Sequence, residues 1–214
     1  MFDPDYVVPL VQAAQAKASR DEILAARLDG QVAYLDRTLG DESRAGVPRA
    51  TELVRRAADS LPLDSRPTYA GLRSLGYPGT ELGDLWRACD LLREFRGDNH
   101  FNVLAANSVA PPVALRTFEA MLGMPRLHYA ASRGWSEEAF AEADEVLAER
   151  GWVVDNKMTE AGTAARAQWE SMTDGLQAPV FAALGDDLDE VVGLLTAVAR
   201  DMAPHGAHPM AALL

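Results

Sequence analysis

Hydrophobic residues recur at three- and four-residue steps along most of the chain, which is the pattern of amphipathic helices. In "SRDEILAARLDGQVAYLDRTLG" (19–40), Ser19 and Glu22 have the spacing of a capping box, and Gly40 is placed to end the helix. The same pattern predicts helices over 48–60, 80–96, 99–108, 111–122 and 186–202. Prolines and glycines make 61–80 a predicted loop. We therefore expect an all-α fold.

The segment that begins at Ser136 has a different pattern. Ser136 is placed to cap a helix that buries Phe140, Ala143 and Leu147 and that ends at Gly151. A β-rich "WVV", a tight Asp-Asn turn, a second short strand and a helix capped by Thr159 are expected to follow. Helix, two-stranded wing and helix are the elements of a winged helix-turn-helix.

The pattern as a whole predicts two domains. Residues 1–124 form a helical bundle, and residues 125–214 form a winged helix-turn-helix of the MarR type with a short two-stranded wing and a C-terminal helix. In that last helix the steps of four, three and three predict a buried stripe. Its members are Leu188, Val192, Leu195 and Val198.

Charge bears on the function of this winged helix. The chain has 32 acids and 20 Lys and Arg residues, a net charge of −12, so duplex DNA repels it unless the bases are segregated. The helix 136–150, which would enter the major groove, has six acids and one base, and the wing offers Lys157 alone. Nucleic acid is therefore an unlikely partner, although a MarR-like regulator stays open as an alternative.

Cysteine content and the distribution of apolar residues favour a cytoplasmic protein. The one cysteine, Cys89, excludes an intramolecular disulfide, and no window approaches 18 uninterrupted apolar residues. The first residues lack the basic and apolar regions of a signal peptide. We expect neither membrane insertion nor secretion.

Three segments resemble the SalK-like family of actinobacterial proteins, and they occur in the expected order over nearly the whole chain. They are "EILAARLDGQVAYLDRTLG", "DLWRACDLLREFRGDNH" and "RGWSEEAF…LAERGWV…TEAG…APVFAALGDD". The family is named for a protein encoded in a polyether-ionophore biosynthetic cluster. The resemblance implies a helical protein that ends in a winged helix and takes part in specialised metabolism, and it implies no particular reaction.

Two departures from the family pattern matter. Members tend to read L-R-E-H-R-G-D-G-H and often have a histidine directly after the tryptophan. This chain has Phe95 at the first histidine of that motif and Arg87 after Trp86, and it keeps His100. Members are also usually longer at the N-terminus. Because "MFDPDYVVPLV" has an apolar face with nothing before it to cover that face, we expect a homo-oligomer or a separately encoded N-terminal partner.

The polar cluster "REFRGDNH" (93–100) has a structural interpretation. Gly97 suits the end of one helix and Asp98 the N-cap of the next. Arg93 and Arg96 would then lie in a last helical turn, where cations complement the helix dipole. This interpretation requires no ligand.

A functional interpretation of the same cluster places a site at the corner. His100, neutral in a first helical turn, would act as the catalytic base, and Asp98 would orient it. Arg93 and Arg96 would clamp a carboxylate or phosphate, with Trp86 beside them. The leading hypothesis is a small-molecule-binding protein, with or without catalysis. A MarR-like regulator and a non-catalytic structural partner of a complex are the alternatives.

We predict no metal site and cannot name a cofactor from the sequence. His205 and His208 have the H-x-x-H spacing, but no third ligand accompanies them.

Overall fold

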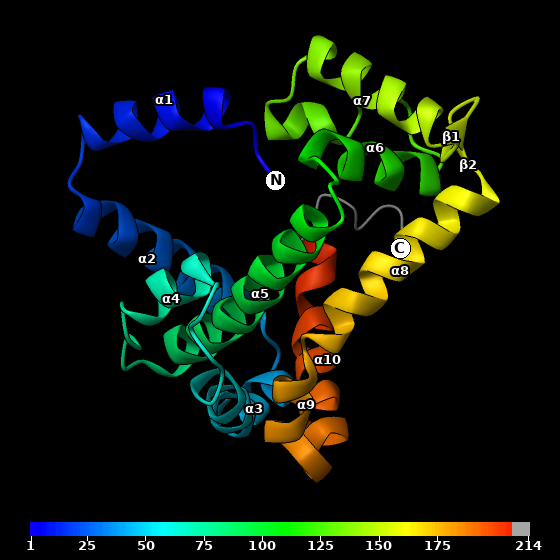
Figure 1. The fold of residues 1–214 in the computed structure, drawn as a ribbon. Helices are drawn as coiled ribbons and strands as arrows, with labels where there is room; N and C mark the ends of the chain where they lie inside the picture. Colours follow the sequence, from blue (N-terminus) through cyan, green and yellow to red (C-terminus); the bar gives the residue numbers. More distant parts are fainter. Residues whose placement is uncertain (207–214) are drawn as a thin grey trace. The chain divides into compact units, whose positions relative to one another are not determined.

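A computed structural model describes residues 1–206 (Figure 1). The α-helices are α1 (Pro4–Gln15), α2 (Arg20–Thr38), α3 (Asp41–Asp59), α4 (Pro67–Arg73), α5 (Glu81–Ala106), α6 (Pro111–Met121), α7 (Glu137–Glu149), α8 (Glu160–Gly175), α9 (Ala178–Leu184) and α10 (Leu188–Met202). The two strands are β1 (Val153–Val154) and β2 (Lys157–Met158), and short 3-10 turns lie at Ala130–Arg133, Gly185–Asp187 and Ala203–His205. The expectation of a helical fold is confirmed, and none of the described helices is long and apolar enough to cross a membrane.

Contacts group the chain into two compact units, neither of which begins or ends at the predicted boundary of 124/125. Unit 1 comprises Met1–Arg20 and Asn99–Gly175, and unit 2 comprises Asp21–Asp98 and the chain from Leu176 onward. The predicted wing and the predicted closing helix consequently fall in different units, and α5 contributes residues to both.

The core of unit 1 is built by α6, α7, α8 and the last turns of α5. Phe140, Ala143 and Leu147 form the buried face of α7, as their spacing predicted. Phe140 packs with Leu115 and Ala130, while Leu147 packs in a second cluster with Trp169. Burial of these large side chains supplies the main stabilisation of the unit.

The helix–hairpin–helix segment of unit 1 follows the sequence prediction closely. The Ser136 hydroxyl accepts a hydrogen bond from the Ala139 N–H at 3.3 Å, and the Thr159 hydroxyl accepts one from the Gly162 N–H at 3.0 Å. β1 pairs antiparallel with β2 through a two-residue turn. Asp155 and Asn156 in that turn both have positive φ, 48° and 60°, as a type I′ turn requires.

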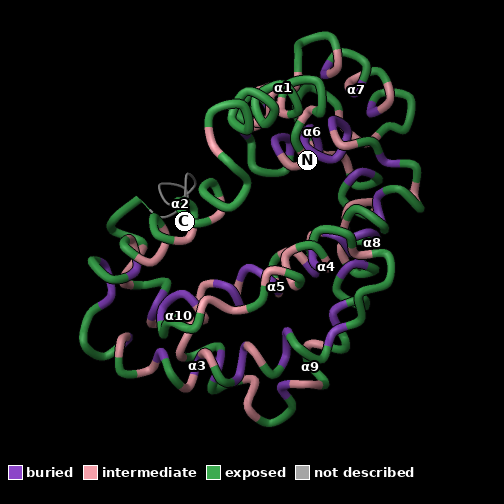
Figure 2. Tube along the Cα trace, turned by 90° about the vertical axis from the view of Figure 1, so that its left-hand side faces the viewer, coloured by how far each residue is buried: buried purple, intermediate pink, exposed green. Residues whose placement is uncertain are grey.

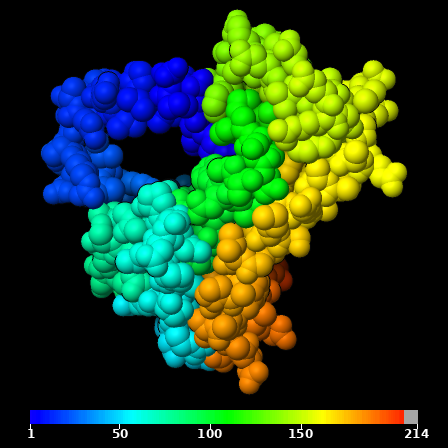
Figure 3. Space-filling view, in the orientation of Figure 1, coloured from blue at the N-terminus to red at the C-terminus, as the bar shows by residue number. Residues whose placement is uncertain are grey.

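Unit 2 packs α3 against α9, α10 and the part of α5 up to Asp98. Figure 2 shows buried positions alternating with exposed ones along these helices, as amphipathic helices require. Leu53 and Val54 of α3 are fully buried in one cluster. Tyr69 of α4 meets Phe95 of α5 edge-to-face, with ring centroids 5.4 Å apart, and extends the core to the short helix. The space-filling view in Figure 3 shows α3 and α9 in direct contact on one face of this unit.

The predicted break at Gly97 is wrong. α5 is one helix from Glu81 to Ala106, so the predicted helices 80–96 and 99–108 are joined. Leu91 and Phe95 before Gly97 and Val103 after it are all buried. The helix continues because it buries residues at helical spacing on both sides of the glycine, and a glycine within a helix is tolerated at modest cost.

Other boundaries also need correction. The predicted loop 61–80 contains α4. The predicted helix 48–60 begins earlier, at Asp41, so Pro48 lies inside α3 and Gly40 is its N-cap. In α10, Val198 is buried as predicted, but Val192 is 54% exposed and Val191 is buried instead. The predicted steps of four, three and three therefore assigned Val192 to the buried face, which is one residue away from the buried Val191.

The helix α1 of unit 1 has no buried residue. Exposed apolar side chains flank or lie on it, namely Phe2, Tyr6, Val8, Leu10 and Val11. The face expected to be apolar is thus exposed in this chain, and its association with a second polypeptide stays a prediction.

Candidate functional site

The residues predicted to form a site on 86–100 do not converge at a corner, because the chain does not turn there. Arg93 and Arg96 are exposed residues of unit 2, whereas His100 belongs to unit 1. The geometric premise of the predicted site is therefore wrong. The assignment of His100 as a base and of Arg93 and Arg96 as a clamp stays a prediction.

Asp98 has a structural role that differs from the predicted one. It does not begin a helix. Its carboxylate, 5% exposed, accepts a hydrogen bond of 2.9 Å from the Tyr69 N–H in the first turn of α4. The N-cap residue of α4, Arg66, makes no such bond from its side chain, so Asp98 supplies this acceptor from α5. In this position Asp98 does not orient His100.

His100 lies in a pair within unit 1. Its Nδ1 is 3.1 Å from the Thr173 hydroxyl, and that hydroxyl donates its own proton to the Trp169 carbonyl at 2.8 Å. With the Thr173 proton on the Trp169 carbonyl, Nδ1–H donates to the hydroxyl; with the roles reversed, the hydroxyl donates to Nδ1. Nδ1 is therefore engaged in a link between α5 and α8.

A charge network in unit 2 surrounds Asp90 of α5. The Asp90 side chain is 2% exposed and accepts from Arg27 at 2.8 Å and from Arg93 at 3.0 Å. Arg93 also pairs with Glu94, where burial raises the pKa of the carboxyl and the charge of Arg93 opposes that shift. The predicted clamp residue Arg93 is thus paired with two acids, and the guanidinium of Arg27 lies 5.9 Å from the ring centroid of Trp86.

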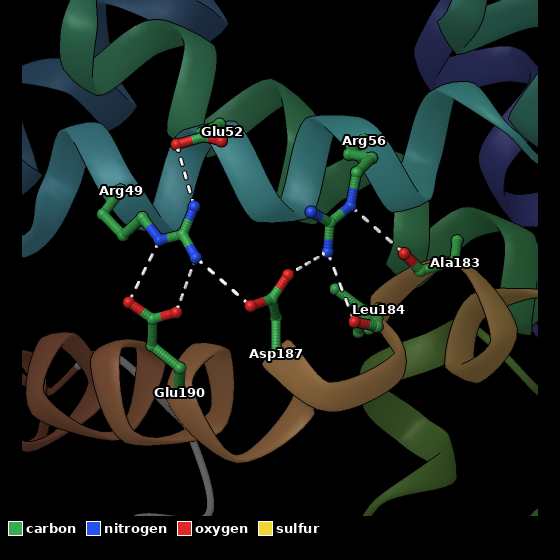
Figure 4. A network of polar contacts seen from close by, with 7 residues as sticks. All are labelled: Arg49, Glu52, Arg56, Ala183, Leu184, Asp187 and Glu190. Atoms are coloured by element: carbon green, nitrogen blue, oxygen red, sulfur yellow. Dashed lines mark hydrogen bonds and ion pairs between the residues drawn. The ribbon is translucent and has the colours of Figure 1, made fainter.

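Arg49 and Arg56 of unit 2 show how its surface arginines are satisfied (Figure 4). Arg49 pairs with Glu190 at 2.7 Å, and Arg56 pairs with Asp187 at 2.6 Å and donates to two carbonyls of α9. These hydrogen bonds lower the pKa of both carboxyls. Each guanidinium therefore has a carboxylate in direct contact that balances its charge.

Arg87 of α5 differs from both. The residue is 8% exposed, and within residues 1–206 its one hydrogen bond runs from Nη1 to the Leu72 carbonyl at 3.2 Å. Its Nε is buried and has no hydrogen-bond partner. Asp90 acts on it electrostatically, but the Asp90 oxygens are bonded to Arg27 and Arg93. Burial lowers the pKa of Arg87, while Asp90 opposes this shift. A buried guanidinium without an acid in contact is costly.

Arg87 also lines a surface cavity of about 200 Å³. The other walls are apolar, from Leu24 and Leu28 of α2 and from Leu75 and Pro78 in the loop between α4 and α5. All of these residues lie in unit 2. The combination of apolar walls with a buried, incompletely bonded cation makes this cavity the candidate ligand site.

In the sequence, Arg87 stands out only as a departure from the family pattern. Nothing in its local spacing distinguishes it from the paired arginines of the same helix. The signal that was available is its place directly after Trp86, on a helix that packs by its apolar face.

A second buried arginine, Arg116 of α6, lies under the hairpin of unit 1. It donates to Asp144 at 2.8 Å and to the Asn156 side chain at 2.5 Å, while its Nη1 is buried without a partner. A cavity of about 330 Å³ adjoins it. Since Asp144 already balances its charge, Arg116 is explained as a brace between α6, α7 and the turn of the hairpin.

Other basic side chains around α7 are also engaged within unit 1. Arg126 pairs with Glu137 and Asp144, and Arg166 pairs with Glu170. Arg150 donates to the Ser108 carbonyl at 2.9 Å and lies over the ring of Trp152. Arg126 and Arg150 are thus bonded within the unit, and α7 itself is rich in acids.

Glu119 of α6 is a buried acid that no sequence pattern indicated. It is fully buried, and its carboxylate accepts three backbone N–H bonds of 2.8 to 3.0 Å, from Leu127, Tyr129 and Ala130. These bonds fix the segment that leads into α7, so the role of Glu119 is structural. No group of three or more potential metal ligands occurs within residues 1–206, and His208 lies outside the described residues.

Comparison with known families gives one clear result. Residues 1–209 match the Helix-turn-helix family. The chain belongs to this family. The match extends over both units and is not confined to the segment around α7. No curated protein and no solved structure shows significant similarity to the chain.

Proposed function

We propose that this member of the helix-turn-helix family is a cytosolic small-molecule-binding protein of the SalK-like type, acting in bacterial specialised metabolism. The observation that carries the proposal is the buried guanidinium of Arg87 at the wall of an apolar cavity in unit 2. A binding pocket characteristically combines apolar walls with a few polar groups that can form hydrogen bonds to a ligand. The sequence resemblance supports the assignment to specialised metabolism.

In this proposal the segment Ala130–Met158 is a winged helix-turn-helix that serves packing and not DNA recognition. The 3-10 turn at Ala130–Arg133 precedes α7 in the place of the first helix of the motif, and the hairpin follows as the wing. An acidic α7 opposes the release of counterions on which affinity for duplex DNA depends. The arginines that would compensate are bonded within the unit.

The family assignment itself favours the alternative, a MarR-like regulator, so the test must include DNA. Fluorescence anisotropy with a labelled random duplex at about 50 mM salt should give a dissociation constant weaker than about 100 μM. A thermal-shift panel of neutral, cationic and anionic small molecules should contain compounds that raise the melting temperature by mass action. Micromolar DNA binding together with a silent panel would overturn the proposal in favour of the regulator.

A further inference from the structure

The cavity beside Arg87 has a composition that restricts what it can hold. Arg87 is 8% exposed, its buried Nε has no acceptor, and no carboxylate of the described chain forms an ion pair with it. Among the residues that line the cavity, Arg87 carries the single charge, and the rest are apolar or glycine. The missing component is therefore an anion, because a neutral acceptor would leave the buried charge unbalanced.

The walls specify the remainder of the ligand. Leu24 and Leu28, one turn apart on α2, line the cavity together with Leu75 and Pro78. Such walls favour an apolar body, and these four side chains offer no hydrogen bond to hydroxyls or amides. A fully hydrated anion such as phosphate would lose its water there without compensation on all sides but one.

The volume of the cavity limits the size of the ligand portion that can enter it. The cavity is about 200 Å³, below the range of about 300 to 1,000 Å³ in which drug-sized ligands bind. An apolar cavity of about 150 Å³ accommodates benzene. The ligand portion that enters is thus about the size of one aromatic ring or a short aliphatic chain.

We propose that unit 2 binds a small monocarboxylate whose carboxylate pairs with Arg87 and whose apolar body lies against Leu24, Leu28, Leu75 and Pro78. The inference rests on the proposed function and specifies its ligand class. A planar carboxylate matches the fork of donors that a guanidinium presents. No chemical step is required, since the pairing is a binding event.

Titration calorimetry of the full chain with benzoate tests this proposal, with benzamide as a neutral probe of nearly the same shape. Benzoate should bind about 10- to 100-fold more tightly than benzamide, the range that a charged hydrogen-bonded pair supports. In the series from acetate to hexanoate, affinity should rise by up to about fourfold per methylene until the cavity is filled.

Three variants locate the site. Arg87→Met should abolish the preference for benzoate over benzamide, and the ligand-free variant should melt at a higher temperature because a buried unpaired charge is gone. Ala25→Leu narrows the cavity while it keeps Arg87, and it should weaken benzoate as well. Arg56→Met removes an arginine that pairs with Asp187 away from the cavity, so it should leave benzoate binding unchanged.

The outcomes separate this proposal from the proposed function. Equal binding of benzoate and benzamide, or benzoate binding that survives both Arg87→Met and Ala25→Leu, overturns the carboxylate site. If neutral or cationic compounds of the panel bind while carboxylates do not, the protein still binds small molecules and only the ligand class is wrong. If Arg87→Met lowers the melting temperature of the free protein and benzoate does not bind the wild type, Arg87 is a structural residue.

Discussion

Two of the three Arg-Gly pairs of the chain follow strong helical patterns, and they adopt opposite structures. In "LAERGWVV" the pair Arg150-Gly151 ends α7: Gly151 has φ of 64°, its N–H bonds the Ala148 carbonyl, and the Trp152 N–H bonds the Leu147 carbonyl. In "REFRGDNH" the pair Arg96-Gly97 lies inside α5, which continues to Ala106. The first is a Schellman motif and the second is an ordinary helical turn.

The difference lies in the residues on the C-terminal side of each glycine. After Gly151 come Trp152 and two valines, residues that favour a strand, and they meet a hairpin turn. After Gly97 come Asp98 and Asn99, which favour helix starts, yet both are buried and Asp98 bonds to α4. A glycine therefore ends a helix when the next residues have a competing structure, and tertiary burial can override a local capping signal.

The largest effect is expected at Gly162, which comes after the Schellman corner in the segment that the sequence predicted well. A Cβ at this position would lie 2.1 Å from the Trp152 carbonyl oxygen, which is backbone and cannot move aside. Gly162→Ala should therefore lower the free energy of unfolding by about 3 kcal/mol. Urea denaturation followed by circular dichroism measures it.

Gly175, at the end of the same helix α8, is the matched control. Nothing lies within 4 Å of a Cβ built there, so Gly175→Ala should be neutral or slightly stabilising. Equal effects of the two substitutions would show that the Trp152 backbone does not approach Gly162 of α8 as described.

A smaller effect is expected at Asp98, in the region that the sequence predicted poorly. Asp98→Ala leaves the buried Tyr69 N–H without an acceptor and should cost about 1 to 3 kcal/mol. Asp98→Asn keeps an acceptor oxygen and should cost less. Hydrogen exchange at the Tyr69 amide distinguishes this role from an N-cap on α5. In Asp98→Ala, exchange at the Tyr69 amide should accelerate if Asp98 caps α4. It should be unchanged if Asp98 caps only its own helix.

Residues with both a local signal and a matching environment were predictable. Ser136, Thr159 and the Asp155-Asn156 turn have short-range hydrogen bonds or backbone angles that their residue types favour intrinsically. The stripe Phe140, Ala143 and Leu147 was predictable because one helix face is buried continuously. Each of these features depends on residues that lie close together in the sequence.

The candidate site was less predictable because it depends on contacts distant in sequence. The acceptor role of Asp98 toward Tyr69 spans 29 residues, and the isolation of Arg87 results from the pairing of Asp90 with Arg27, 63 residues away. Local spacing cannot tell an arginine that finds an acid from one that does not. The predicted ligand chemistry, a carboxylate or phosphate on arginine, is retained as a carboxylate, but the residue proposed to bind it has moved from Arg93 and Arg96 to Arg87.

The central claim, that α5 runs unbroken through Gly97 while α7 ends at Gly151, is tested most directly by one pair of alanine substitutions. Gly97→Ala should raise the free energy of unfolding by about 0.5 to 1 kcal/mol, because an alanine Cβ meets nothing closer than the Glu94 carboxylate at 3.7 Å and alanine favours the helix. Gly151→Ala should lower it by about 1 kcal/mol, because alanine is strained at positive φ. Effects of opposite sign in urea denaturation support the claim. A loss of stability in Gly97→Ala equal to that in Gly151→Ala would contradict it.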